Sequence, residues 1–90
     1  MTAETTPAAM RLKLAELISV ACDREVSAQR IVEAADVPLT ALGVGSLARL
    51  RLIDGIEDEF GLFVEADDIF DALENLTDLT QWLCDLQETR

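Results

Sequence analysis

The sequence predicts an all-α protein with three longer helices, one short helix and a long first connection. Apolar residues recur at helical spacing near residues 8–22, 47–60 and 77–86, with a shorter apolar group between the last two stretches. No run alternates β-branched and polar residues in the way that a half-buried strand does. Because 90 residues make one small domain with a shallow core, we expect a flexible tail at residues 1–7 and a single domain at residues 8–90.

The first helix is expected from Ala8 to Cys22. Apolar residues at i, i+4, i+7, i+8 and i+11 form one stripe along it, and its charged residues lie off that stripe. The stripe consists of Met10, Leu14, Leu17, Ile18 and Ala21. This helix is therefore expected to pack one face against the core.

The connection between the first two long helices, residues 23–45, has no long periodic run, and a structureless loop of that length is unusual in so small a domain. Ser27 can cap a short helical piece, which Pro38 then stops because proline disfavours a helical conformation in the residue before it. Leu39 and Leu42 are spaced so that they can anchor the segment to the core.

The second helix is expected from Leu47 to Phe60, and Gly61 is expected to end it. Its broad apolar face is predicted to consist of Leu47, Leu50, Ile53, Ile56 and Phe60, widened by Leu52. Arg49 and Arg51 lie near its start and acidic residues near its end, an order that opposes the helix macrodipole. This indicates that the charges serve something other than helix stability, with random drift as the alternative.

The rest of the chain supplies the short helix and the last long one. Residues 62–64 form a short apolar connection, and residues 66–73 can form a brief helix with Ile69, Phe70 and Leu73 pointing inward. Thr77 is expected to cap the last helix. Apolar residues repeat along that helix at i, i+3, i+4 and i+7: Leu79, Trp82, Leu83 and Leu86. Trp82 and the phenylalanines are expected in the core.

Ser46 follows a loop with two glycines and precedes the second helix, in the stretch Leu42-Gly43-Val44-Gly45-Ser46-Leu47. One interpretation makes this serine the N-cap of the helix, with its oxygen accepting a backbone hydrogen bond. The other makes it a hydroxyl that the loop presents to a modifying enzyme. Both roles can belong to one residue.

The charge of the chain is unevenly distributed. The net charge is −11; residues 1–53 hold 6 acidic and 6 basic side chains, whereas residues 54–90 hold 12 acidic side chains and one basic. The second part would repel nucleic acids and anionic membranes, so we expect neither as a partner. It would attract proteins with basic patches, mainly by speeding encounter. The alternative is that the charge only keeps the protein in solution.

Independent catalysis is not expected. The chain has no His and no Tyr, so no nucleophile has an imidazole partner. Cys22 and Cys84 stand far apart without the spacing of a zinc or redox site, and are expected to be half-buried thiols in a reducing compartment. A calcium loop starting at Asp54 would need glycine where Glu59 stands. We therefore expect neither catalytic residues nor a metal site. No targeting or membrane segment is visible, which predicts a cytoplasmic protein.

The glycine loop with its serine, the run Glu57-Asp58-Glu59-Phe60-Gly61 and the run Thr77-Asp78-Leu79 together resemble the acyl carrier and peptidyl carrier family. The resemblance spans about Met10 to Leu86. It implies a right-handed four-helix bundle, acyl-carrier-protein-like, whose Ser46 receives a 4′-phosphopantetheine arm from coenzyme A through a separate phosphopantetheinyl transferase. The thiol of that arm holds an acyl or aminoacyl group as a thioester.

The resemblance also implies the partners. They are the transferase, an acyl- or aminoacyl-loading enzyme, and downstream synthases, transferases or tailoring enzymes of fatty-acid, polyketide or nonribosomal-peptide type biosynthesis. The residues expected to contact them are Gly45, Leu47, Arg49, Arg51 and Asp54. We expect a monomeric, free-standing carrier, although the cargo is left open.

Gly45 departs from the family pattern, which usually has Asp directly before the serine. A carboxylate there would stabilise the helix start and could help to bind the transferase and its metal. The departure leaves open an alternative function, a helical protein-interaction module of the same fold that is not phosphopantetheinylated.

Overall fold

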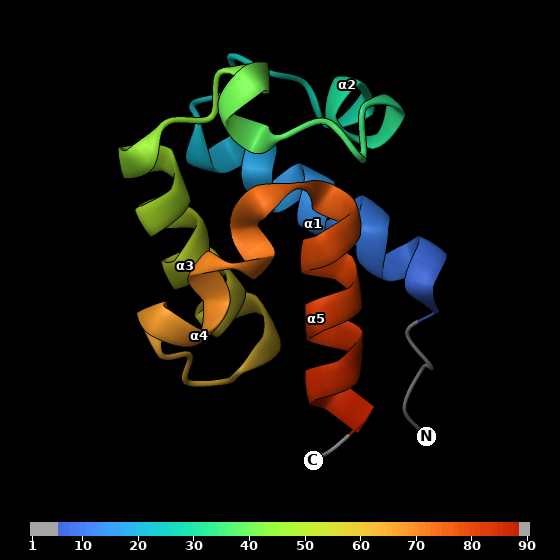
Figure 1. Ribbon diagram of the computed structural model, residues 1–90, viewed down its shortest axis with the longest axis vertical. Coiled ribbons are helices and arrows are strands. Elements are labelled where there is room, and N and C mark those ends of the chain that lie inside the picture. The colour runs from blue at the N-terminus through green and yellow to red at the C-terminus, as the bar shows by residue number, and fades with distance from the viewer. Residues whose placement is uncertain (1–5, 89–90) are drawn as a thin grey trace.

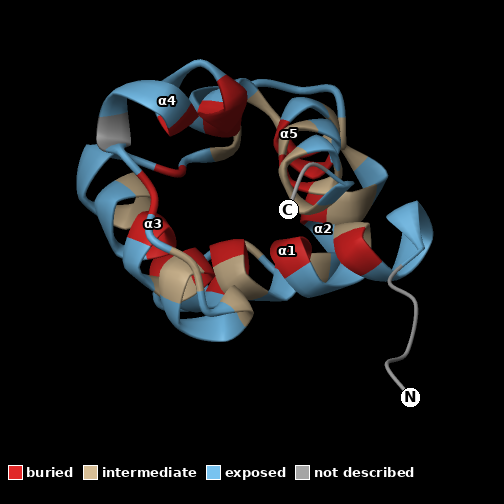
Figure 2. Ribbon diagram, turned by 90° about the horizontal axis from the view of Figure 1, so that it is seen from below, coloured by how far each residue is buried: buried red, intermediate tan, exposed pale blue. Residues whose placement is uncertain are grey.

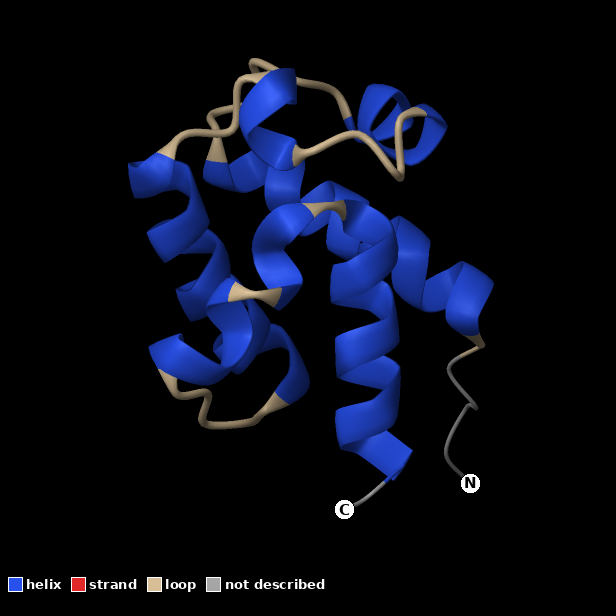
Figure 3. Ribbon diagram, in the orientation of Figure 1, coloured by secondary structure: helices blue, strands red, loops and turns tan. Residues whose placement is uncertain are grey.

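The computed structural model describes residues 6–88, which form helices joined by loops, without a strand among these residues (Figure 3). Three long helices and one short helix form the bundle: α1 (Pro7–Ala21), α3 (Ser46–Phe60), α4 (Ala66–Phe70) and α5 (Leu76–Glu88). The first connection contains α2 (Ala28–Glu33) and the 3-10 helix η1 (Leu39–Leu42), and a second 3-10 turn, η2 (Ala72–Glu74), precedes α5. The predicted all-α class, with its three longer helices, is confirmed.

α1 is the central helix, because it packs against α2, α3 and α5 (Figure 1). The buried residues of α1, α3, α4 and α5 turn toward a common interior (Figure 2). Every element of the bundle contributes at least one fully buried side chain to this core. These side chains include Met10, Leu14 and Ile18 from α1, Leu52 and Ile56 from α3, Ile69 from α4, and Leu76, Leu79 and Leu83 from α5.

The long first connection is anchored as predicted. Ser27 caps α2, because its Oγ accepts a hydrogen bond from the Arg30 N–H at 3.1 Å. Ile31 and Leu39 are both fully buried, and they fix the connection to the core at two points. The sequence did not predict that Leu39 and Leu42 would belong to a 3-10 turn.

The starts of α1 and α5 differ from the prediction. α1 begins at Pro7 rather than Ala8, because the Thr6 hydroxyl accepts from the Ala9 N–H at 3.1 Å and so caps it. The expected tail at residues 1–7 therefore includes the start of α1, and residues 1–5 lie outside the described residues. Thr77 does not cap α5. The Asn75 Oδ1 accepts from the Asp78 N–H at 2.7 Å, while the Thr77 hydroxyl donates to Asp36 at 2.6 Å.

Several residues expected in the core are exposed. Leu47 and Leu50 of α3 are 62% and 52% exposed, so the predicted apolar face of this helix was wrong over its first turns. Phe63 and Phe70 are also exposed, at 81% and 46%. Phe70 is the last residue of α4, and the expected brief helix 66–73 divides there into α4 and η2.

Candidate functional site

The loop before α3 is held by a buried valine between two glycines. Val44 is fully buried, and its N–H donates to the Leu39 carbonyl at 3.0 Å. Gly43 has a φ of 96°, a left-handed conformation that glycine adopts without strain, and it closes η1. The chain therefore turns sharply from the core toward the surface immediately before Ser46.

Ser46 is the first residue of α3 and not its cap. The N-cap is Gly45, in an extended conformation with φ −82° and ψ −176°, and no side chain caps the helix. The interpretation of Ser46 as N-cap was therefore wrong. Its side chain is exposed, and no backbone amide holds its hydroxyl within α3. The hydroxyl is consequently open to a second protein.

One side chain approaches the Ser46 hydroxyl. The Nη2 of Arg49, one helical turn further along α3, lies 3.5 Å from Ser46 Oγ. Arg49 is half-buried, and its Nε is buried without a hydrogen-bond partner. Ser46 thus lies beside a guanidinium group that has donors to spare.

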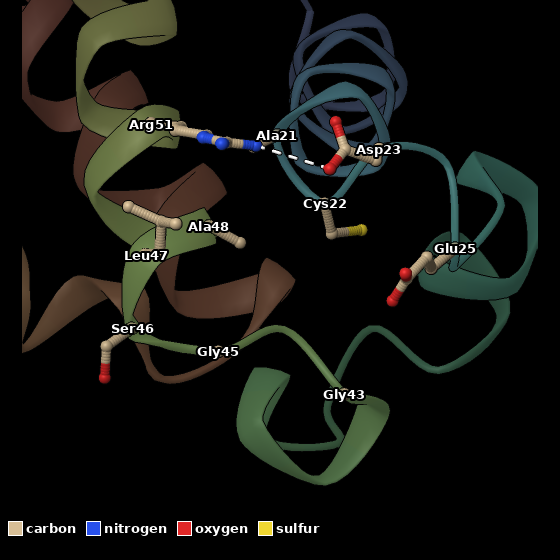
Figure 4. A pocket seen from close by; sticks show the side chains of 10 residues that line it. All are labelled: Ala21, Cys22, Asp23, Glu25, Gly43, Gly45, Ser46, Leu47, Ala48 and Arg51. Atoms are coloured by element: carbon tan, nitrogen blue, oxygen red, sulfur yellow. Dashed lines mark hydrogen bonds and ion pairs between the residues drawn. The ribbon is translucent and has the colours of Figure 1, made fainter.

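A groove of about 320 Å³ lies next to Ser46. The end of α1 and the turn after it form one wall, and the start of α3 forms the other (Figure 4). Arg51 reaches across and lies 3.4 Å from Asp23, an exposed pair that contributes little to stability. The Ser46 hydroxyl points away from the other labelled side chains, so that it lies on the rim of the groove (Figure 4).

The predicted contact residues divide between two faces of α3. Successive helical residues are about 100° apart, so Arg51 and Asp54 lie within about 40° of Leu47 round the helix. All three are exposed. Arg49 lies about 200° from Leu47, and is half-buried on the opposite face. Leu50 was assigned to the core from the sequence, but it is 52% exposed and belongs to the exposed face of α3. Its exposure in the structure, and not its spacing in the sequence, shows this.

The later part of α3 presents an acidic surface. Asp54, Gly55, Glu57 and Asp58 line an open depression of about 520 Å³. Glu57 also has a structural role that the sequence did not reveal, because its carboxylate accepts from the Val64 N–H at 2.8 Å and ties the loop to α3. Among residues 6–88, no cluster of three or more potential ligands could hold a metal ion.

The two cysteines are both free thiols. Cys22 is buried and lines the groove, and its Sγ donates to the Ser19 carbonyl at 3.5 Å. Cys84 on α5 is half-buried. Burial, together with the carboxylates of Asp85 and Glu88, raises the pKa of the Cys84 thiol. Cys84 is therefore a weak nucleophile at neutral pH, since the thiolate is the reactive form.

The fold and the site define a class of protein: a small helical bundle that presents an exposed hydroxyl at the start of a long helix. The family model for the phosphopantetheine attachment site matches residues 12–83, and the chain belongs to this family. The group that the family carries is covalently attached 4′-phosphopantetheine. No curated protein and no solved structure matches the chain significantly. Within the described residues, none of the helices has the length and apolar character needed to span a membrane.

Proposed function

We propose that Ser46 is the attachment point of the phosphopantetheine arm, and that the protein carries acyl or aminoacyl groups as thioesters on that arm. The observation that carries the proposal is the exposed Ser46 hydroxyl at the first position of α3, inside the matched region. The arm supplies the thiol that holds the cargo. The chain's own residues orient the arm and are recognised by other enzymes.

The surroundings of Ser46 fit such a group. The hydroxyl is exposed and lies on the rim of an open groove, where a transferase can reach it. The nearby Arg49 carries the charge opposite to that of a phosphodiester. The buried Val44 fixes the loop on the other side of Gly45, and therefore holds the start of α3 in a constant position.

The exposed face of α3 is the surface that we assign to partner enzymes. It consists of Leu47, Leu50, Arg51 and Asp54, with Gly45 at its edge. Two exposed leucines beside charged side chains suit a small interface that forms and separates in each cycle. The acidic residues after Asp54 would guide basic partner surfaces toward this face.

The partners that this role requires are a phosphopantetheinyl transferase, a loading enzyme, and downstream synthases or tailoring enzymes. Fatty-acid, polyketide and nonribosomal-peptide biosynthesis all use carriers of this kind. In this role the protein acts as a monomer and catalyses no reaction itself. Gly45 favours one alternative, an unmodified interaction module, because it supplies no carboxylate before Ser46.

Mass spectrometry tests the attachment. The protein is incubated with coenzyme A and a broad-range phosphopantetheinyl transferase, and it should gain the mass of one phosphopantetheine. Ser46→Ala should gain nothing. Ser27→Ala is the matched control, because Ser27 is another exposed serine at a helix start, and this variant should load like the wild type.

Two results contradict the proposal. One is a Ser46→Ala protein that still gains the mass. The other is a wild-type protein that stays unmodified while a control carrier protein of this family, with Asp before its serine, is loaded in the same mixture. In that case, partner binding by Ser46→Ala that equals partner binding by the wild type would support the unmodified interaction module.

A further inference from the structure

We propose that Arg49 is a positioning residue that holds the phosphate of the arm attached to Ser46. This inference rests on the proposed function, because it concerns the group carried by the same hydroxyl. It removes Arg49 from the partner-binding surface and gives it a different role from that of Arg51.

The distance between the two side chains supports this role. Arg49 Nη2 already lies 3.5 Å from Ser46 Oγ, near the outer limit of a hydrogen bond. A phosphate bonded to Oγ places its unesterified oxygens two bonds from that atom, within the same region as the guanidinium group. A guanidinium offers several N–H donors in one plane, a geometry that matches phosphate oxygens.

Arg49 is also available for such a contact. Among residues 6–88 the ion pairs join Lys13 to Glu59, Arg24 to Glu16 and Arg51 to Asp23, and none of them includes Arg49. Its Nε has no acceptor, although this atom is buried. An unpaired donor in a buried position costs free energy, and a nearby anion would reduce that cost. The half-buried Arg49 side chain therefore has no carboxylate partner and can bind a phosphate group.

The start of α3 adds to the attraction. Gly45 provides no side-chain cap, so the first amides of a 15-residue helix have no carboxylate or hydroxyl facing them. The positive end of the helix dipole and the Arg49 charge both lie beside Ser46. An acidic residue at position 45 would neutralise part of this positive charge. With glycine there, the charge remains available for the phosphate.

The test uses phosphorus NMR. Phosphoserine is incorporated at position 46 by genetic code expansion, which requires no transferase, and its ³¹P signal is titrated with pH. The second ionisation of a phosphoserine has a pKa of about 6, and a neighbouring cation lowers it. We expect the midpoint to rise by about half a pH unit in Arg49→Gln and by less in Arg49→Lys, which keeps the charge.

Arg51→Gln is the matched control, since it removes the same charge two residues away, from a side chain paired with Asp23. Its midpoint should stay close to that of the wild type. The loaded protein gives a second measurement: the ³¹P shift of the phosphodiester should change in Arg49→Gln and stay unchanged in Arg51→Gln.

The proposal for Arg49 is overturned if Arg49→Gln titrates like the wild type, or if Arg51→Gln shifts the midpoint as much as Arg49→Gln does. Failure of the proposed function looks different, because it appears as a wild-type protein that does not gain mass from coenzyme A. The titration of phosphoserine measures the effect of Arg49 on a phosphate at Ser46 in either case.

Discussion

α3 and α5 are helices of similar length with apolar residues at regular spacing, yet they place these residues differently. In α5 the apolar residues of the predicted stripe face the core. Leu79 and Leu83 are fully buried, and Trp82 and Leu86 are half-buried. In α3 the first two leucines of the predicted stripe, Leu47 and Leu50, are exposed. One helix therefore serves the core along its length, whereas the first turns of the other serve the surface beside Ser46.

The spacing of the residues explains the difference. The leucines of α5 at positions 76, 79, 83 and 86 follow one another at steps of three, four and three residues, which keeps them on one face of a helix with 3.6 residues per turn. The predicted stripe of α3 advances by three residues each time, from Leu47 to Ile56. Each such step falls about 60° short of a full turn, so these two residues lie about 180° apart. Since Ile56 is fully buried, Leu47 must face away from the core.

The largest expected effect separates the two helices by stability. Leu83→Ala on α5 should lower the free energy of unfolding by about 2–5 kcal/mol, because it leaves a cavity in the core. Leu50→Ala on α3 should lower it by about 0.5 kcal/mol or less, because about half of the residue is in solvent. Urea unfolding followed by far-UV circular dichroism measures both. Equal losses would show that Leu50 is packed in the core, and would contradict the contrast between α3 and α5.

A second prediction concerns recognition instead of stability. Leu47→Ala should lower kcat/KM for loading by the transferase about 10-fold, as expected when an apolar interface residue contributes more than 1 kcal/mol. Leu12→Ala is the matched control, because Leu12 on α1 has the same exposure of 62%. It should leave the loading rate unchanged, and both variants should keep the wild-type unfolding midpoint. Equal rates for the two variants would remove Leu47 from the partner-binding surface.

Much of the fold could be predicted because it depends on local patterns. Glycine at position 61 ends α3 in the left-handed conformation, with φ 65°, as expected of a helix terminator. Ser27 caps α2 as expected. The cap of α5 was missed because Asn75 and Thr77 can both cap a helix. Asp36, which is distant in sequence, accepts a hydrogen bond from the Thr77 hydroxyl, and Asn75 caps the helix instead. Contacts of this kind leave no periodic signal.

The candidate site was predictable in part. The glycine loop and Ser46 are adjacent in sequence, so their motif could be recognised directly. The different roles of Arg49 and Arg51 could not be recognised in the same way. The two residues are of the same type and only two positions apart, but one lies beside Ser46 Oγ and the other is paired with Asp23 of the turn after α1. The two arginines can be told apart only when the positions of α1 and α3 relative to each other are known.

The smallest expected effect lies at the start of α3. Position 45 has an ordinary extended backbone, and nothing lies within 4 Å of an added Cβ, so Gly45→Asp introduces no strain. An aspartate there can cap α3 and interact favourably with the helix dipole, which should stabilise the protein by about 0.5 kcal/mol. It should also load faster, because a carboxylate beside Ser46 would help to bind the transferase and its metal ion. Thermal unfolding and initial loading rates measure the two effects, with Gly45→Asn as the uncharged control. If Gly45→Asp is more stable but loads no faster than Gly45→Asn, the carboxylate matters to the helix alone and the exposed face of α3 is sufficient for recognition.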